Sequence, residues 1–232
     1  MRKILILVLS SLEHPYDKML DNSLRTWDSI EVDGVETVFY CEQSDKENTD
    51  KIIYMPVDNT LESVTMKTYL ALEWALQNKE FDFIARIHSS IYCNKKELVK
   101  YIDTLPNENV FSGIVVNSEP IFMWGGFGYV ISKDVIEKLV VGKSYWEFDK
   151  MDDYALSRAA TKLGVPYTNG YGCSIDKIDS GWQCICYGTE SYNIKSFSEI
   201  KKDNGQYHFR VKQDYDRTVD TYIMEQLYEN LK

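Results

Sequence analysis

The middle of the chain carries a hydrophobic pattern that predicts a helix followed by a buried strand. Residues 61–94 read LESVTMKTYLALEWALQNKEFDFIARIHSSIYCN. Met66, Leu70 and Trp74 recur at steps of four, which is the spacing of one apolar helix face. Aromatic and branched side chains then crowd residues 81–87, as in a buried strand. The polar triplet that follows lies at the carboxyl end of this strand, where open α/β sheets bind ligands.

Apolar runs and helical spacing continue along the rest of the chain. Residues 2–9 form an unbroken apolar run, typical of a central strand in a parallel sheet, and Ser10 follows where a nucleotide would lie. Asn59 and Glu62 have the spacing of a capping box before the central helix. The other expected helices cover residues 16–30, 95–105, 134–140, 152–163 and 220–231, and the other expected strands cover residues 35–40, 52–55, 110–116 and 207–211.

Length and net charge narrow the class of protein. The 232 residues suffice for one sizeable α/β domain, and no Pro-, Gly- or Ser-rich linker, repeat or low-complexity tract divides them. The formal net charge of −10 argues against general nucleic-acid binding, which needs a basic surface. A nucleotide ligand stays possible, because a few local cations can hold one diphosphate.

The cysteines and the N-terminus favour a cytoplasmic protein. Five cysteines, at positions 41, 93, 173, 184 and 186, are an odd number without a Cys-x-x-Cys pair, which predicts reduced thiols. The apolar run after Met1 is short and no small-residue cleavage site follows it, so a first strand is favoured over a signal peptide. No run reaches the roughly 20 apolar residues of a membrane span.

Three motifs in order carry a resemblance to a known family. The first is the central helix with Lys67-Thr68 and Trp74, the second is GFGYVIS at 126–132, and the third is DDYALS at 152–157. Over roughly residues 20–165 they resemble the beta-1,3-glycosyltransferase and fringe group. One motif departs from the family, because His88-Ser89-Ser90 stands where those enzymes have an acidic-x-acidic motif.

The resemblance implies a fold and an activity. The fold would be a GT-A type nucleotide-sugar-binding α/β fold, with a mixed, largely parallel sheet and helices on both faces. One domain would span residues 1–232, with a nucleotide-binding part over about 1–95 and an acceptor and catalytic part over about 96–232. The implied activity is inverting transfer of a sugar from a nucleotide donor, a UDP-sugar, to a hydroxyl of a glycan or glycoconjugate. Eukaryotic relatives have a membrane anchor, and its lack here implies a bacterial or viral protein.

The resemblance also assigns residues. In the family the Asp of the third motif deprotonates the acceptor hydroxyl, which implies that Asp153 is the base. Asp152 would cap or orient the helix, and carboxylates stabilise helix N-termini without any catalytic role as well. A surface ion pair remains the alternative for Arg25, and a solvated helix face for Lys67. The implied donor site consists of Ser10, Arg25, Lys67, Arg86, His88, Ser89 and Ser90, and the implied sugar site of Trp124, Gly125 and Gly126.

The missing acidic motif leaves three alternatives, because that motif holds a divalent metal in the relatives. Arg25, Lys67 and Arg86 could replace the metal, or His88 and His208 could keep a weakened metal site. The chain could instead be an inactive relative that binds a nucleotide, a glycan or a partner protein. We expect weak or absent dependence on Mn²⁺ or Mg²⁺, since serine supplies no ionised oxygen ligand.

Overall fold

The computed structural model describes residues 1–188, 190–200, 205–213 and 217–232. A seven-stranded sheet forms its centre, and β1 pairs in parallel with β2 on one side and β4 on the other. β3 continues in parallel beside β2, whereas β9 runs antiparallel between β4 and β6. The strands, in spatial order, are β10 (Thr168–Asn169), β6 (Phe111–Gly113), β9 (Tyr129–Ser132), β4 (Phe83–His88), β1 (Ile4–Leu9), β2 (Val35–Cys41) and β3 (Ile52–Tyr54).

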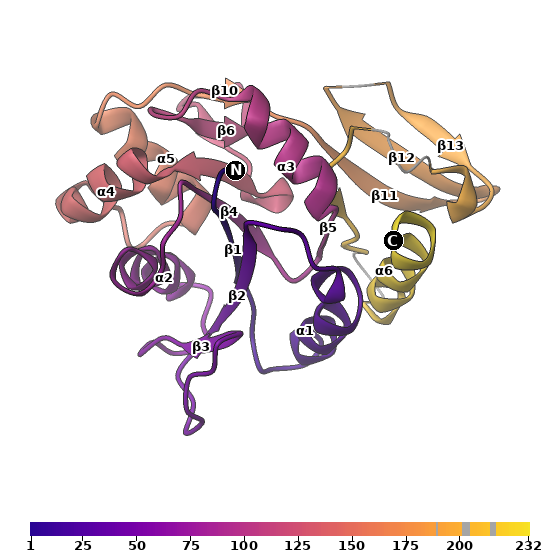
Figure 1. Ribbon diagram of the computed structural model, residues 1–232, viewed down its shortest axis with the longest axis horizontal. Helices are drawn as coiled ribbons and strands as arrows, with labels where there is room; N and C mark the ends of the chain where they lie inside the picture. Colours follow the sequence, from indigo (N-terminus) through magenta and orange to yellow (C-terminus); the bar gives the residue numbers. More distant parts are fainter. Residues whose placement is uncertain (189, 201–204, 214–216) are drawn as a thin grey trace.

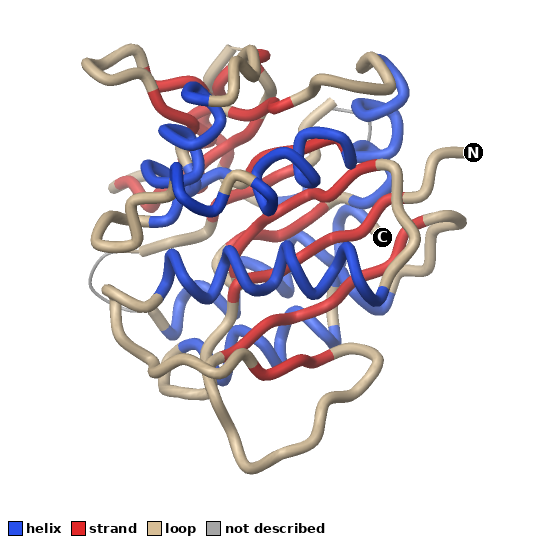
Figure 2. The backbone as a smooth tube through the Cα atoms, turned by 90° about the vertical axis from the view of Figure 1, so that its left-hand side faces the viewer, coloured by secondary structure: helices blue, strands red, loops and turns tan. Residues whose placement is uncertain are grey.

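Helices cover both faces of this sheet (Figure 1). Side chains alternate along a strand, so Ile4, Ile6 and Val8 of β1 pack into one hydrophobic core and Leu5 and Leu7 into the other. In the view turned by 90°, helices lie in front of the central strands (Figure 2). None of the described helices is long and apolar enough to cross a membrane. The first face carries α1 (Tyr16–Arg25), α3 (Lys95–Thr104) and α6 (Thr218–Leu231), and the second carries α2 (Val64–Asn78), α4 (Lys133–Val141) and α5 (Asp152–Lys162).

A second sheet of five strands packs beside α6 at one end of the molecule (Figure 1). Its edge strand β5 follows β4 directly in the sequence and pairs antiparallel with β14, so the C-terminal part of the chain lies next to the end of β4. The strands in spatial order are β13 (Tyr192–Ile194), β12 (Gly181–Tyr187), β11 (Gly172–Ile178), β14 (His208–Arg210) and β5 (Ile91–Cys93), and a separate two-stranded ribbon joins β7 (Val115–Val116) to β8 (Phe122–Met123).

The predicted mixed, largely parallel sheet with helices on both faces is confirmed. Two local predictions are wrong. The helix expected over 16–30 ends at Arg25 and gives way to a 3-10 turn, Trp27–Ser29. The capping box is absent, because α2 starts one turn later than expected with Ser63 as its N-cap, and that side chain makes no capping hydrogen bond.

The prediction that all cysteines are reduced thiols is also wrong. Cys173 and Cys186 form a disulfide between β11 and β12. The two residues lie directly opposite each other in the antiparallel pair, with their Cα atoms 4.2 Å apart, which is slightly shorter than the usual separation. Their sequence separation of 13 gave no sign of this pairing, because it depends on the register of the hairpin. Cys41, Cys93 and Cys184 are buried free thiols.

Candidate functional site

A pocket of about 490 Å³ opens at the carboxyl ends of β1 and β4. These two strands are parallel, with Leu9 opposite His88, and the amide of Ser89 donates to the carbonyl oxygen of Leu9 (3.0 Å). The polar residues that follow both strands therefore meet at one edge of the sheet. Predicted site residues that line the pocket are Ser10, Lys67, Arg86, His88, Ser89, Ser90, Trp124, Gly125, Gly126, Asp152 and Asp153.

Asp153 lies on the wall of this pocket, in the first turn of α5. Its Oδ2 accepts a hydrogen bond from the amide of Gly125 (3.0 Å) and its Oδ1 accepts one from the amide of Tyr154 (2.8 Å). Burial, and then the neighbouring charge of Asp152, raise the pKa of Asp153 above its usual value. Both carboxylate oxygens keep unused lone pairs, so Asp153 can accept a proton from a ligand in the pocket.

Gly125 fits tightly against Asp153. A Cβ atom at position 125 would lie 2.8 Å from the Cβ of Asp153 and 3.1 Å from its Oδ2. Real Cβ atoms do not approach other heavy atoms that closely, so the hydrogen bond from the Gly125 amide requires glycine. The resemblance assigned Gly125 to the sugar site, and in the structure its amide holds the carboxylate of Asp153.

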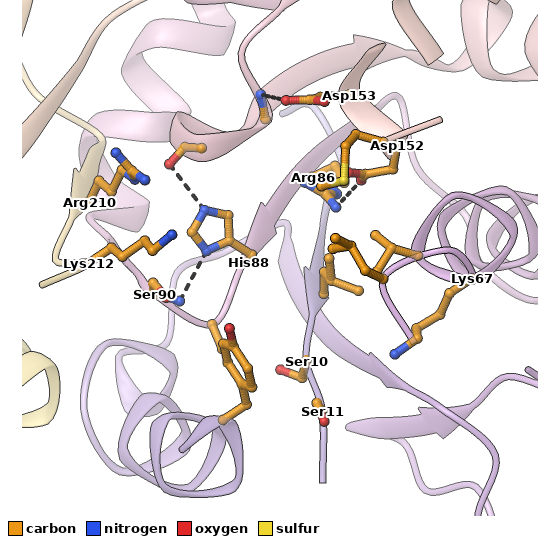
Figure 3. Close-up of a pocket in the computed structure, with 18 of the residues that line it drawn as sticks. Ser10, Ser11, Lys67, Arg86, His88, Ser90, Asp152, Asp153, Arg210 and Lys212 are labelled. Atoms are coloured by element: carbon orange, nitrogen blue, oxygen red, sulfur yellow. Dashed lines mark hydrogen bonds and ion pairs between the residues drawn. The ribbon is translucent and has the colours of Figure 1, made fainter. Parts of the chain in front are cut away.

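Asp152 points away from Asp153 into a buried network (Figure 3). It pairs with Arg86, and its Oδ2 also accepts from the hydroxyl of Thr68 (3.1 Å). Arg86 in turn donates from Nε to the hydroxyl of Tyr40 (3.1 Å), and its side chain is 2% exposed. Of the two roles predicted for Asp152, capping the helix is wrong, since Met151 is the N-cap of α5. Asp152 instead neutralises Arg86 and ties α5 to β4.

Lys67 is buried, although a helical lysine is more often solvated. Its ammonium donates to Glu42 (3.0 Å), and Glu42 also accepts from the amide of Leu12 (2.7 Å) and the hydroxyl of Ser11 (3.1 Å). Burial would raise the pKa of Glu42, but these hydrogen bonds and the charge of Lys67 hold it below its usual value. The network connects α2 to the ends of β1 and β2 at the wall of the pocket, which Lys67 and Ser11 line.

His88 fixes the loop that carries Gly125. Its Nε2 lies 3.1 Å from the carbonyl oxygen of Gly126, and its Nδ1 lies 3.2 Å from the amide of Ser90 (Figure 3). Burial, and then the charges of Arg86 and Arg210, lower its pKa to about 3. The ring is therefore neutral at physiological pH, with Nε2 as donor to Gly126 and Nδ1 as acceptor from Ser90.

The residues around the end of β4 do not fit a Mg²⁺ or Mn²⁺ site, which requires several oxygen ligands, usually carboxylates. Backbone groups occupy both ring nitrogens of His88, and the hydroxyl of Ser90 accepts from Arg217 (2.5 Å). His208 lies outside the pocket lining, with Nδ1 2.8 Å from the carbonyl oxygen of Phe127 and a buried Nε2. In the described part of the chain, no three His, Cys, Asp or Glu residues cluster as metal ligands.

Three cations that the sequence did not single out line the pocket. They are Arg210, Lys212 and Arg217, which follow one another at and after the end of β14. Figure 3 shows Arg210 and Lys212 together on the wall that also carries His88, across the cavity from Lys67. Arg25, which the resemblance placed in the donor site, does not line this pocket. It forms the alternative that the sequence left open, a surface ion pair, with Asp21 on α1 (3.1 Å).

Trp124, which directly precedes Gly125, contacts this cationic wall. The guanidinium of Arg210 lies 5.5 Å from the centroid of the Trp124 ring and 5.8 Å from that of Phe127, within the range of cation–π attraction. Tyr187 packs edge-on against both rings, at 5.9 and 4.9 Å between centroids. The aromatic cluster thereby joins the second sheet to the pocket.

Comparisons with known proteins support the architecture. No family model matches the sequence, and no curated protein matches it. A glycosyltransferase involved in the glycosylation of the major capsid of PBCV-1 has a similar structure, with a TM-score of 0.56, 13% identity and coverage of 97% of this chain and 100% of that chain. A mannosyltransferase from Pyrobaculum calidifontis has a TM-score of 0.47 and 14% identity, and covers 73% of this chain and 55% of its own.

The similarity to the first of these structures extends over nearly the whole chain. It shows that the protein has a GT-A-like α/β fold, as the resemblance predicted. Identity of 13% shows the fold alone, so the activity has to be argued from the pocket.

Proposed function

We propose that this protein is an inverting glycosyltransferase, which moves a sugar from a UDP-sugar to a hydroxyl of a glycan or glycoconjugate. The observation that carries the proposal is the composition of one pocket. A partly buried carboxylate, Asp153, lies on one wall, and cations lie on others (Figure 3). A donor diphosphate needs cations and an acceptor hydroxyl needs a base, and this cavity offers both. Its place at the carboxyl ends of β1 and β4 supports a nucleotide ligand.

The proposed reaction is a single displacement at the anomeric carbon of the donor sugar. The acceptor oxygen forms a bond to this carbon while the bond from the carbon to the phosphate oxygen breaks. The electron pair of the broken bond stays on the nucleoside diphosphate, and the acceptor proton passes to Asp153. One displacement inverts the configuration of that carbon. The raised pKa makes Asp153 a stronger base than an ordinary aspartate.

The hydrogen bonds around Asp153 support this role. The amides of Gly125 and Tyr154 hold its carboxylate in one orientation, and His88 holds the same loop through Gly126. Positioned groups of this kind contribute to catalysis because the base need not be ordered in the transition state. Asp152 forms an ion pair with Arg86 and accepts a hydrogen bond from Thr68, so it is a positioning residue in this proposal.

The test is release of nucleotide from UDP-, GDP- and CMP-sugars, followed by chromatography of the products with and without glycan acceptors. We expect release from a UDP-sugar. Thermal shift with each free nucleotide supplies a readout independent of turnover, because a ligand stabilises the fold by about RT ln(1 + [L]/Kd). If GDP raises the melting temperature and UDP does not, the proposal of a UDP-sugar donor is rejected. Nucleotide binding without turnover of any sugar nucleotide would make the chain a binding protein instead of an enzyme.

A further inference from the structure

We propose that Arg210, Lys212 and Arg217 form a basic clamp that holds the donor diphosphate and does the work a divalent metal would otherwise do. The inference rests on the proposed function and names how its substrate is bound. All three residues line the pocket, on the wall next to the end of β4. None of them belongs to the set of residues that the sequence motifs suggested.

Main-chain pairing builds the clamp. Arg210 of β14 lies opposite Ile91 of β5, and the amide of Val211 donates to the carbonyl oxygen of Ser90 (2.9 Å). These contacts place the segment after β14 directly beside the polar break that ends β4. The wall is therefore part of the hydrogen-bonded framework, which is how a preorganised anion site is built.

The three side chains are held to different degrees. Arg217 is fixed by Asp220, with Nε 2.6 Å from Oδ2, and by the hydroxyl of Ser90, 2.5 Å from Nη2. Arg210 stacks on the rings of Trp124 and Phe127. Lys212 is exposed, and no described residue accepts a hydrogen bond from its ammonium, which Figure 3 shows directed into the cavity. Lys212 is the cation most available to a phosphate.

The charges of the lining favour an anionic ligand in an otherwise acidic chain. Five cations line the pocket, Lys67, Arg86 and the three of the clamp, together with the carboxylates of Asp152 and Asp153. Glu42 and Asp220, which do not line it, pair with Lys67 and Arg217, so the five cations exceed these four carboxylates by one. The chain as a whole has a formal net charge of −10. Cations are thus concentrated where the proposed diphosphate binds, although they are a minority overall.

Ser10 supplies an independent indication of a ligand. It follows β1, lines the pocket, and is 3% exposed, and its hydroxyl has no hydrogen-bond partner in the described part of the structure. A buried hydroxyl left without a partner costs stability. A phosphate or ribose oxygen in the pocket would satisfy it.

The neutral triplet His88-Ser89-Ser90 is consistent with the clamp. The hydroxyl of Ser90 accepts from Arg217, which already pairs with Asp220. A carboxylate at position 90 would add a second negative charge beside that guanidinium and weaken its attraction for a phosphate. Serine at this position adds no such charge.

The experiment is calorimetric titration of the full chain with UDP, once in EDTA and once in Mn²⁺, for the wild type, Lys212→Ala and Lys177→Ala. Lys177 is an exposed lysine on β11 outside the pocket lining, so its variant is a control with the same loss of charge. Lys212 lies outside helices and strands, which keeps the fold intact in its variant. We expect the wild type to bind UDP in EDTA, Lys212→Ala to bind it about tenfold more weakly, and Lys177→Ala to bind it as the wild type does.

The outcomes separate the clamp from the proposed function. UDP binding that requires Mn²⁺, or equal binding by wild type and Lys212→Ala in EDTA, overturns the clamp and leaves the glycosyltransferase proposal standing. No binding of UDP in either condition overturns the UDP-sugar proposal and the clamp together. A second variant, Ser90→Asp, should weaken binding in EDTA, because the new carboxylate would pair with Arg217.

Discussion

Replacement of Asp153 by asparagine removes the proposed base with little change in shape. General-base catalysis contributes a factor of about 10² to 10⁴, so we expect turnover of Asp153→Asn to fall by that order while UDP binding is retained. Sugar transfer and the dissociation constant for UDP are to be measured on the same preparations. Turnover of Asp153→Asn near the wild-type rate would refute the assignment of the base.

Stability distinguishes loss of the base from loss of the fold. The two oxygens of Asp153 accept from the amides of Gly125 and Tyr154, and an asparagine can satisfy only one of them. The raised pKa of Asp153 has an opposing effect. When folding raises the pKa of a carboxyl group, the free energy of unfolding of the protein falls as the pH increases through that pKa. Asparagine does not ionise, so the variant does not lose this stability at neutral pH. We expect the two effects to leave the melting temperature within about 4 °C of the wild type.

The raised pKa also predicts the pH dependence of the reaction. The base works only when ionised, so kcat/KM should fall on the acid side as Asp153 takes up a proton. Because burial and the charge of Asp152 raise the pKa of Asp153, the acid limb should lie above the ordinary pKa of an aspartate. A pH–rate profile that stays flat down to pH 4 would contradict this expectation.

Three further predictions follow from contacts in and near the pocket. Asp152→Asn leaves the buried Arg86 without its ion-pair partner, so chemical denaturation should show a loss of about 3–5 kcal/mol in unfolding free energy. Gly125→Ala forces a Cβ against Asp153, so transfer should fall by about 10²-fold with UDP binding kept, as steady-state kinetics will show. Alkylation of the denatured chain, measured by mass spectrometry, should modify three cysteines before reduction and five after it, and five before reduction would contradict the β11–β12 disulfide.

Local patterns predicted most of the framework. The spacing of Met66, Leu70 and Trp74 located α2, and the apolar runs located β1 and β4, because these signals come from neighbouring residues. The face of α2 was less well predicted. Those three side chains are only partly buried, and the fully buried side of the helix includes Lys67 and Thr68, which polarity alone would place in solvent.

The pocket could be predicted only in part, for a different reason. Residues after β1 and β4 meet because parallel strands end at the same edge, and that rule can be applied to a sequence. The clamp residues Arg210, Lys212 and Arg217 come to the pocket through the pairing of β14 with β5, more than 100 residues away in the chain. The disulfide likewise depends on the register between β11 and β12. Neither strand pairing can be recognised from the residues next to it in the sequence.

The central claim is that this pocket binds the sugar-nucleotide donor with its diphosphate at the basic wall and Asp153 open to the acceptor. The most direct measurement is a crystal structure of the chain with UDP, grown with and without Mn²⁺. We predict that UDP lies at the carboxyl ends of β1 and β4, with its phosphates against Lys212 and Arg210 and no contact that blocks Asp153. UDP bound at another surface, or phosphates placed away from this wall in both crystals, would contradict the account.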